Sequence, residues 1–306
     1  MSDAGAGARA ALVAITLIWA ANWAVMKAAL AMADPFTFNI HRTLLACAVL
    51  FGVQVVRRGP LWPESWVAIV VTGLFQVSIN FLATAMALVE GGAGRTSVLV
   101  FTMPFWTLLL AWPMLGERPR GAQWWAIALA FAGLLLIVAP WHWEGALAPK
   151  LYAVLGGFGW AAATVATKVF QRARRFDPVN FVGWQLLLGL TPFFPIVALR
   201  GAPVVPLEPM TPSYLLLVGY AGIVSIAIAW LLWLSILNRL SASAAGFSML
   251  AIPVLALGIS IVFFGETIAA GEWWGMALIA GGLALLGLLG RRAARAAPPI
   301  ETESPP

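Results

Sequence analysis

Two stretches of sequence that lie half a chain apart decide the fold: "MPFWTLLLAWPMLGERPRGAQWW" (Met103–Trp125) and "IPVLALGISIVFFGETIAAGEWW" (Ile252–Trp274). With a shift of 149 residues, both start near a proline, continue through an apolar run, reach Gly-Glu and end in Trp-Trp. A pattern that returns at such a distance indicates two copies of one larger structural unit.

The composition places the chain in a membrane. Of its 306 residues, 62% are hydrophobic and 10% are charged, and the mean hydropathy is +0.92. Soluble domains average about 45–50% apolar and about 25% charged residues. Apolar runs near twenty residues recur from end to end, which predicts an all-α integral membrane protein whose surroundings are the lipid bilayer, with no nucleic acid as partner.

Ten apolar runs are each near the ~20 residues that a bilayer core requires. They cover residues 10–33, 36–56, 66–89, 95–115, 122–139, 151–171, 178–199, 213–237, 242–264 and 273–290. Of the 18 Lys and Arg, thirteen fall on one side of these spans and three on the other. The positive-inside rule then predicts a multi-pass membrane protein with both termini in the cytoplasm.

The repeat extends beyond the opening stretches. A tryptophan followed eight residues later by a lysine occurs at Trp19 and at Trp160, and Asp-Pro-x-x-Phe occurs at Asp34 and at Asp177. Spans 1–5 therefore map onto spans 6–10. Because five is odd, the second copy must cross the membrane in the opposite direction, and inverted repeats of this kind are typical of transporters.

The expected organisation is a first repeat at residues 1–139, a linker at 140–150, a second, inverted repeat at 151–290 and a disordered cytoplasmic tail at 291–306. Asp-Pro at the start of a span indicates a helix N-cap followed by proline in the first turn. The Gly-Glu pairs indicate helix ends. Pro104 and Pro253 are expected to kink their spans, and they are the candidate gating or hinge positions.

Ten spans in an inverted five-plus-five repeat, with Pro-x11-Gly-Glu-x6-Trp-Trp closing each half, resemble the EamA type of the drug/metabolite transporter (DMT) superfamily over about residues 10–290. Within it, the chain looks most like the YddG-like exporters of aromatic and other amino acids, which implies a place in the bacterial inner (plasma) membrane. The resemblance implies export of small metabolites through a central cavity lined mainly by spans 1, 3, 4, 6, 8 and 9.

Polar side chains inside spans are candidates for substrate contact, because burying them in a membrane is costly. Span 3 carries Thr72, Gln76, Asn80 and Thr84 at intervals of four, which places them on one face of an α-helix. Hydrogen bonding between helices is the alternative explanation of such a stripe.

Aromatic side chains are concentrated in the same central region. The chain has 16 Trp, and several lie deeper than an interfacial belt would require. Packing is the commoner role of an aromatic stripe, yet a cavity of aromatic rings and amides would suit an amphipathic zwitterion. The predicted substrate-binding residues are Trp19, Asn22, Trp23, Gln76, Asn80, Phe101, Trp160 and Trp230.

The charged residues argue against other mechanisms. All twelve Asp and Glu fall in loops, tails or helix ends, so facilitated diffusion is expected rather than proton coupling. Lys27, His41 and Arg42 lie towards the outer ends of spans 1 and 2, where a lysine is expected to extend its amine to the headgroups. Neither a metal site nor any other cofactor is expected, because there are two histidines, one cysteine and no phosphate-binding loop.

Three alternatives remain. The same fold could export other small solutes such as nucleosides or drugs, with or without proton coupling. An enzyme is not expected, because Glu117 and Glu266 fall on opposite faces of the membrane and form no carboxylate pair. A purely structural role would leave the central amides unexplained.

The small residues of span 10 are expected to pack within the monomer, and the monomer is the favoured oligomeric state.

Overall fold

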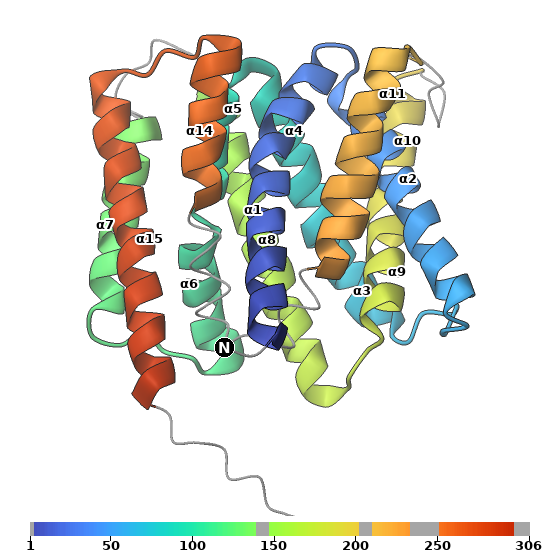
Figure 1. Ribbon diagram of the computed structural model, residues 1–306, viewed down its shortest axis with the longest axis horizontal. Helices are drawn as coiled ribbons and strands as arrows, with labels where there is room; N and C mark the ends of the chain where they lie inside the picture. Colours follow the sequence, from blue (N-terminus) through green and yellow to red (C-terminus); the bar gives the residue numbers. More distant parts are fainter. Residues whose placement is uncertain (1–2, 139–146, 202–209, 233–250, 297–306) are drawn as a thin grey trace, which may run out of the picture.

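The computed structural model describes residues 3–138, 147–201, 210–232 and 251–296. Over these residues the chain is an all-α bundle whose helices run roughly side by side, with both ends of the described chain at the same end of the bundle (Figure 1). We call this the terminal end and the opposite one the distal end.

The helices match the predicted spans in order and position. Two of them, η1 and η2, have the wider turns of a π-helix. The bounds are α1 Asp3–Leu30, α2 Pro35–Val56, α3 Trp66–Gly73, η1 Leu74–Phe81, α4 Leu82–Glu90, α5 Ala93–Val100, α6 Met103–Leu115, α7 Gln123–Val138, α8 Leu147–Ala173, α9 Pro178–Leu190, α10 Phe193–Leu199, α11 Pro212–Gly219, η2 Tyr220–Ile228, α14 Ala251–Phe264 and α15 Ala270–Ala296.

Eight helical stretches among the described residues are long and apolar enough to cross a membrane, and two shorter apolar helices occupy the positions of the fifth and ninth spans. The end of the eighth span and the start of the ninth fall in residues 233–250, outside the described part. The all-α membrane fold is confirmed.

Two spans are interrupted. The fourth breaks at Phe101–Thr102, so Pro104 lies in the first turn of α6, where the missing N–H of proline costs no hydrogen bond. The seventh breaks at Thr191–Pro192, between α9 and α10. Pro253 lies in the first turn of α14, and the residues before Ala251 are outside the described part.

The predicted helix starts are confirmed in both repeats. Asp34 caps α2 by accepting hydrogen bonds from the backbone N–H groups of Phe36 and Thr37 at 2.9 and 3.3 Å. Asp177 caps α9 by accepting from the backbone N–H of Asn180 at 2.8 Å. In both, proline occupies the first helical position.

The two repeats exchange equivalent helix contacts. A Cβ at Gly73, in the third span, would meet the backbone oxygen of Gln185 in the seventh span at 2.7 Å. A Cβ at Gly222, in the eighth span, would meet the backbone oxygen of Arg42 in the second span at 2.6 Å. The fifth and tenth spans, α7 and α15, pack against each other. These crossed contacts are those of an inverted five-plus-five arrangement.

Two predicted boundaries are corrected. Residues 291–296, assigned to the disordered tail, continue α15 to Ala296, because their alanines and arginines favour a helix. Residues 147–150, assigned to the linker, begin α8, with Pro149 in its first turn. Most of the predicted linker and the tail beyond residue 296 lie outside the described residues.

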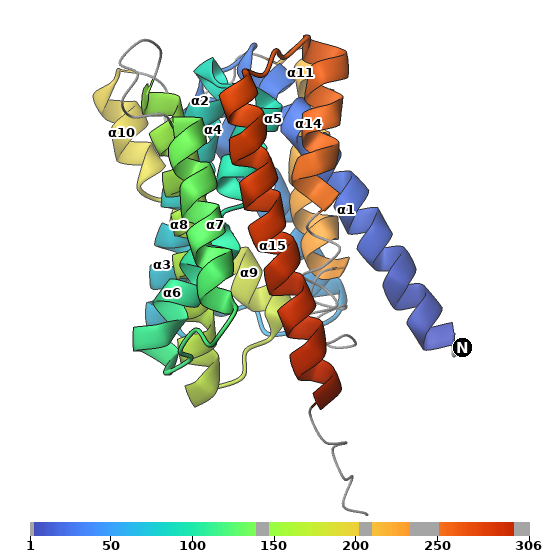
Figure 2. The same cartoon turned by 90° about the vertical axis from the view of Figure 1, so that its left-hand side faces the viewer.

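Helix α1 leans away from the bundle towards its N-terminus (Figure 2). Its side chains Val13 and Leu17 are 59% and 56% exposed, as expected for positions that face lipid. Its C-terminal half lies inside the bundle, where Trp23 and Met26 are buried. The inner half of α1 is therefore the part that can form a site.

Candidate functional site

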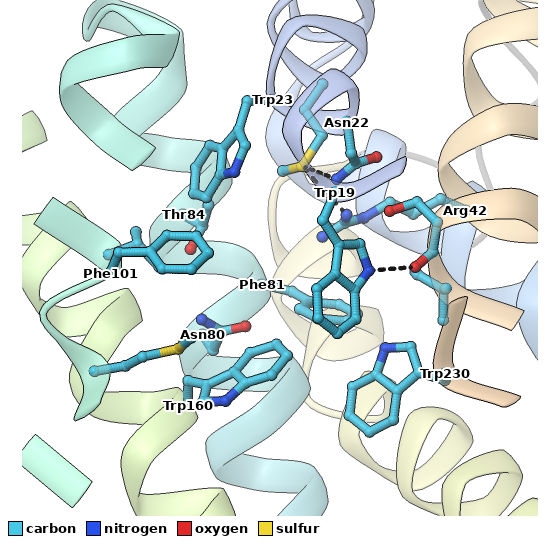
Figure 3. A pocket seen from close by; sticks show the side chains of 15 residues that line it. Trp19, Asn22, Trp23, Arg42, Asn80, Phe81, Thr84, Phe101, Trp160 and Trp230 are labelled. Carbon is cyan, nitrogen blue, oxygen red and sulfur yellow. Dashed lines mark hydrogen bonds between the residues drawn. The ribbon is translucent and has the colours of Figure 1, made fainter. Parts of the chain in front are cut away.

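A pocket of about 100 Å³ lies inside the bundle, between the two repeats (Figure 3). The first repeat supplies residues from α1, α2, η1, α4, α5 and α6, and the second supplies residues from α8, η2 and the turn after η2. The lining residues are Trp19, Asn22, Trp23, Met26, Arg42, Asn80, Phe81, Thr84, Val100, Phe101, Met103, Trp160, Ser225, Ile226 and Trp230.

The structure brings together seven of the eight predicted substrate-binding residues at this pocket, and Gln76 is the exception. The spans predicted to line the cavity also do so, apart from the ninth, which supplies no lining residue among those described, and the second contributes in addition. Their role in binding remains a prediction.

Aromatic rings form most of the pocket wall. The indole of Trp19 meets that of Trp160 edge to face, with ring centroids 6.2 Å apart. Trp160 in turn lies 5.8 Å from Trp230, and on the opposite side Trp23 lies 6.5 Å from Phe101. Trp19 donates its indole N–H to the backbone oxygen of Ser225 in η2 at 3.0 Å, which fixes this ring between the two repeats. Such a wall suits a flat apolar group.

Two polar groups interrupt this wall where α1 faces α2. Asn22 donates its amide N–H to the sulfur of Met26 at 3.1 Å, while its side-chain oxygen is buried without a hydrogen-bond partner among the described residues. The guanidinium of Arg42 reaches the same sulfur at 3.5 Å. Asn22 and Arg42 therefore lie next to each other at one side of the pocket (Figure 3).

Arg42 is the charged residue of the site, and the sequence did not predict it there. Its side chain is 3% exposed, and its guanidinium lies 4.3 Å from the ring centre of Phe81 and 5.0 Å from that of Phe38. Arg42 is the eighth residue of α2, about 10 Å, or two turns, from the start of the helix, so it lies inside the span. Asn39 lies one turn before Arg42 on the same side of the helix and accepts its hydrogen bonds, so this polar pair is the sequence signal for a buried arginine.

The polar stripe of the third span is buried, but only part of it reaches the pocket. Asn80 and Thr84 line the pocket, but Gln76 lies behind them and donates its amide to the side-chain oxygen of Asn80 at 3.3 Å. Asn80 donates to the backbone oxygen of Gly156 at 2.7 Å, and Thr72 donates to Ala68 of its own helix. All four side chains of the predicted stripe are buried, and Asn80 and Thr84 line the pocket, whereas substrate contact by Gln76 stays a prediction.

The other charged and titratable groups of the first two spans lie away from the pocket. Lys27 donates to the backbone oxygens of Leu88, Val89 and Gly91 at 2.5, 3.1 and 2.8 Å, a cation at the end of α4 rather than one extended to the headgroups. His41, for which the sequence offered no partner, lies 2.9 Å from the hydroxyl of Tyr214. No Asp or Glu is buried in the described part of the chain.

The sequence profile of the EamA-like transporter family matches residues 8–139 and again residues 148–288, almost the whole chain. The chain belongs to the EamA-like transporter family. It is therefore a multi-pass membrane protein of the transporter class, and the pocket between its two family repeats is the natural candidate for its substrate site.

Relatives of this EamA-like chain match between 59% and 92% of its length. "Uncharacterized transporter YoaV" of Bacillus subtilis (strain 168) is 25% identical over 261 residues, which are 83% of this chain and 86% of that one. "Probable amino-acid metabolite efflux pump" of Salmonella typhimurium is 25% identical over 298 residues, covering 92% and 95%. "Riboflavin transporter" of Rhizobium johnstonii is 35% identical over 181 residues, covering 59% and 57%.

A solved structure, named only "Crystal structure of protein", has the same fold. It superposes with a TM-score of 0.66 and covers 94% of this chain and 99% of its own, at 21% sequence identity. At this identity the likeness concerns the arrangement of the helices alone.

Proposed function

We propose that this EamA-family transporter exports small amphipathic metabolites, foremost aromatic and other neutral amino acids, from the cytoplasm across the inner membrane. The observation that carries the proposal is the pocket itself: aromatic rings from both repeats enclose it, and a few amides and one guanidinium interrupt the rings on one side. The "amino-acid metabolite efflux pump" relatives add support.

The proposed mechanism is alternating access without a catalysed reaction. The substrate docks between the repeats, which then rock about the helix break before Pro104 and about Pro253 in the ninth span. The absence of buried Asp or Glu among the described residues supports facilitative transport rather than proton coupling. The three to thirteen division of Lys and Arg supports cytoplasmic termini.

The test is efflux from proteoliposomes that contain the purified protein and are preloaded with labelled tryptophan, phenylalanine, threonine or uridine. We expect saturable efflux of the amino acids at the same rate with and without a pH gradient. Efflux that requires the gradient would contradict the facilitative mechanism, and efflux of uridine alone would contradict the amino-acid assignment.

A matched pair of tryptophans tests whether the pocket is the site. Trp160→Ala removes the ring that touches both Trp19 and Trp230, whereas Trp112→Ala removes a ring of the partly exposed Trp112–Trp124 pair elsewhere. We expect the first change to raise the half-saturating phenylalanine concentration about 2- to 10-fold and the second to leave it unchanged. Equal effects would place the site elsewhere.

A second candidate is export of a larger planar solute with polar ring edges. It is favoured by the relative named as a riboflavin transporter and by the number of tryptophans around the pocket. Riboflavin and a drug-like planar compound, added to the same efflux series, test this candidate: efflux of these solutes without efflux of amino acids would favour it.

A further inference from the structure

Arg42 is a buried cation without a matching anion. Of the ion pairs formed by the described residues, none includes Arg42, and none of the described Asp or Glu side chains is buried with it. A charge removed from water and from headgroups is costly unless a counter-charge accompanies it. The rings of Phe38 and Phe81 provide partial compensation through cation–π contact.

The hydrogen bonds of Arg42 hold its guanidinium in place but leave donors unused. Its Nε and one Nη donate to the side-chain oxygen of Asn39 at 2.9 and 2.7 Å, and the other Nη reaches the sulfur of Met26 at 3.5 Å. Asn39 is itself oriented by donating to the backbone oxygen of Pro35 at 2.7 Å. A guanidinium has five N–H groups, so donors remain for a ligand in the pocket that Arg42 lines.

An acceptor of the opposite character lies beside it. The side-chain oxygen of Asn22 is buried without a partner among the described residues, and so is the hydroxyl of Thr84 on the far wall. Buried acceptors of this kind normally have a partner, so a ligand or water molecule is expected there. Asn22 and Arg42 both contact the sulfur of Met26, so the free acceptor and the free cation adjoin.

An α-amino acid carries its carboxylate and its ammonium on one carbon atom and therefore needs a cationic donor and a neutral acceptor in adjoining positions. We propose, on the basis of the function proposed above, that Arg42 binds the carboxylate of the substrate and that the side-chain oxygen of Asn22 accepts from its ammonium. The side chain of the substrate then lies among Trp19, Trp160 and Phe101. Arg42 thereby determines specificity for solutes with a free carboxylate.

The test uses ligand-induced thermal stabilisation of the purified protein, which does not depend on transport. The ligands are phenylalanine, 3-phenylpropionate, which has the carboxylate alone, and phenylalaninamide, which has the ammonium alone. We expect phenylalanine to bind at least about tenfold more tightly than the amide, as for loss of a charged hydrogen bond. 3-Phenylpropionate should fall between the two.

Two arginine variants locate the effect. Arg42→Gln should weaken binding of phenylalanine and 3-phenylpropionate about tenfold or more while leaving binding of phenylalaninamide unchanged. Arg200→Gln is the matched control, because Arg200 also lies 4.3 Å from a phenylalanine ring, that of Phe36, but is exposed and outside the pocket. It should bind all three ligands as the unmodified protein does.

Equal binding of phenylalanine and phenylalaninamide to the unmodified protein would overturn the proposal. This comparison does not depend on the folding of any variant. Failure of all three ligands to bind, or Arg42→Gln binding phenylalanine normally, would also overturn it. The proposed function fails separately: carboxylate-dependent binding without efflux from proteoliposomes would leave Arg42 as an anion-binding residue and remove amino-acid export. Efflux of amino acids and their amides alike would keep amino-acid export and remove the role of Arg42 in binding the carboxylate.

Discussion

The two Gly-Glu pairs that close the repeats share one backbone role, but their glutamate side chains have different surroundings. Gly116 and Gly265 both end a helix with a positive φ, of 73° and 61°, and in both cases the N–H of the following Glu bonds six residues back. At the terminal end, Glu117 is 51% exposed and lies 3.7 Å from the exposed Arg172. At the distal end, Glu266 is bonded into the neighbouring repeat.

Glu266 replaces a missing helix cap. Helix α5 starts after Gly92, which has no side chain to accept from the first free N–H groups. The carboxylate of Glu266 accepts from the backbone N–H groups of Gly94 and Arg95 at 3.0 and 3.2 Å and from the hydroxyl of Ser260. A negative group at a helix N-terminus is also favoured by the helix dipole. The repeated motif thus ends a helix in both places, but it joins the two repeats tightly at the distal end alone.

The largest difference between the two ends is expected for the glutamates themselves. Glu266→Gln removes the charge that caps α5 and should lower the free energy of unfolding by ~1–2 kcal/mol. Glu117→Gln breaks an exposed ion pair and should cost less than about 0.5 kcal/mol. Thermal unfolding of the two variants in detergent provides the measurement. Losses of equal size would contradict the distinction between the ends.

A smaller difference is expected for the arginines that join the repeats. At the distal end, Arg95 donates to the carboxylate of Glu272 at 2.8 Å, and the two side chains are 25% and 13% exposed. At the terminal end, Arg57 lies 3.3 Å from Asp177 and is 48% exposed. Arg95→Gln should cost ~1 kcal/mol and Arg57→Gln about half of that or less, because water screens the second pair.

The same unfolding assay checks this second comparison. Adding Glu272→Gln to Arg95→Gln should then cost little more, since the pair is already broken. A full additional loss on removal of the glutamate would show that the two side chains stabilise the fold independently.

No difference is expected for the glycines. Gly116→Ala and Gly265→Ala each place a Cβ on a residue with positive φ, and an added Cβ at either position would have no atom within 4 Å. Both changes should therefore cost ~1–2 kcal/mol through backbone strain alone. If the free energies of unfolding of the two variants differ by more than ~1 kcal/mol, the backbone role of the two glycines is not equivalent at the two ends.

Helix ends and spans were predictable from sequence because they depend on local chemistry. The caps at Asp34 and Asp177 need nothing beyond an aspartate and a following proline, and the apolar runs define the spans by length. The helix break in the seventh span was missed, although Thr191–Pro192 offered a proline as the signal. The tail was taken to begin at residue 291, where the apolar run ends, whereas α15 continues to Ala296.

The pocket was predicted in composition but not in detail. Trp19, Asn22 and Trp160 reach it because they lie midway along their spans. Gln76 does not line it, because its amide is bonded to the side-chain oxygen of Asn80, and the spacing of the residues does not reveal which members of a polar stripe face the cavity. Arg42 was placed towards the outer end of the second span because depth was counted along the sequence, whereas Asn39, Met26 and Phe81 hold its guanidinium at the pocket.

The position of Arg42 also has a consequence for the insertion of the protein into the bilayer. An arginine at the centre of a helix adds up to about 2.5–3.5 kcal/mol to the free energy of insertion, so Arg42 makes insertion of α2 less favourable than an apolar residue at that position would. Met26, Phe38 and Asn39 precede Arg42 in the chain and accompany it from the start, but Phe81 is synthesised almost forty residues later. The contact between Arg42 and Phe81 can therefore form only after the third span has been synthesised.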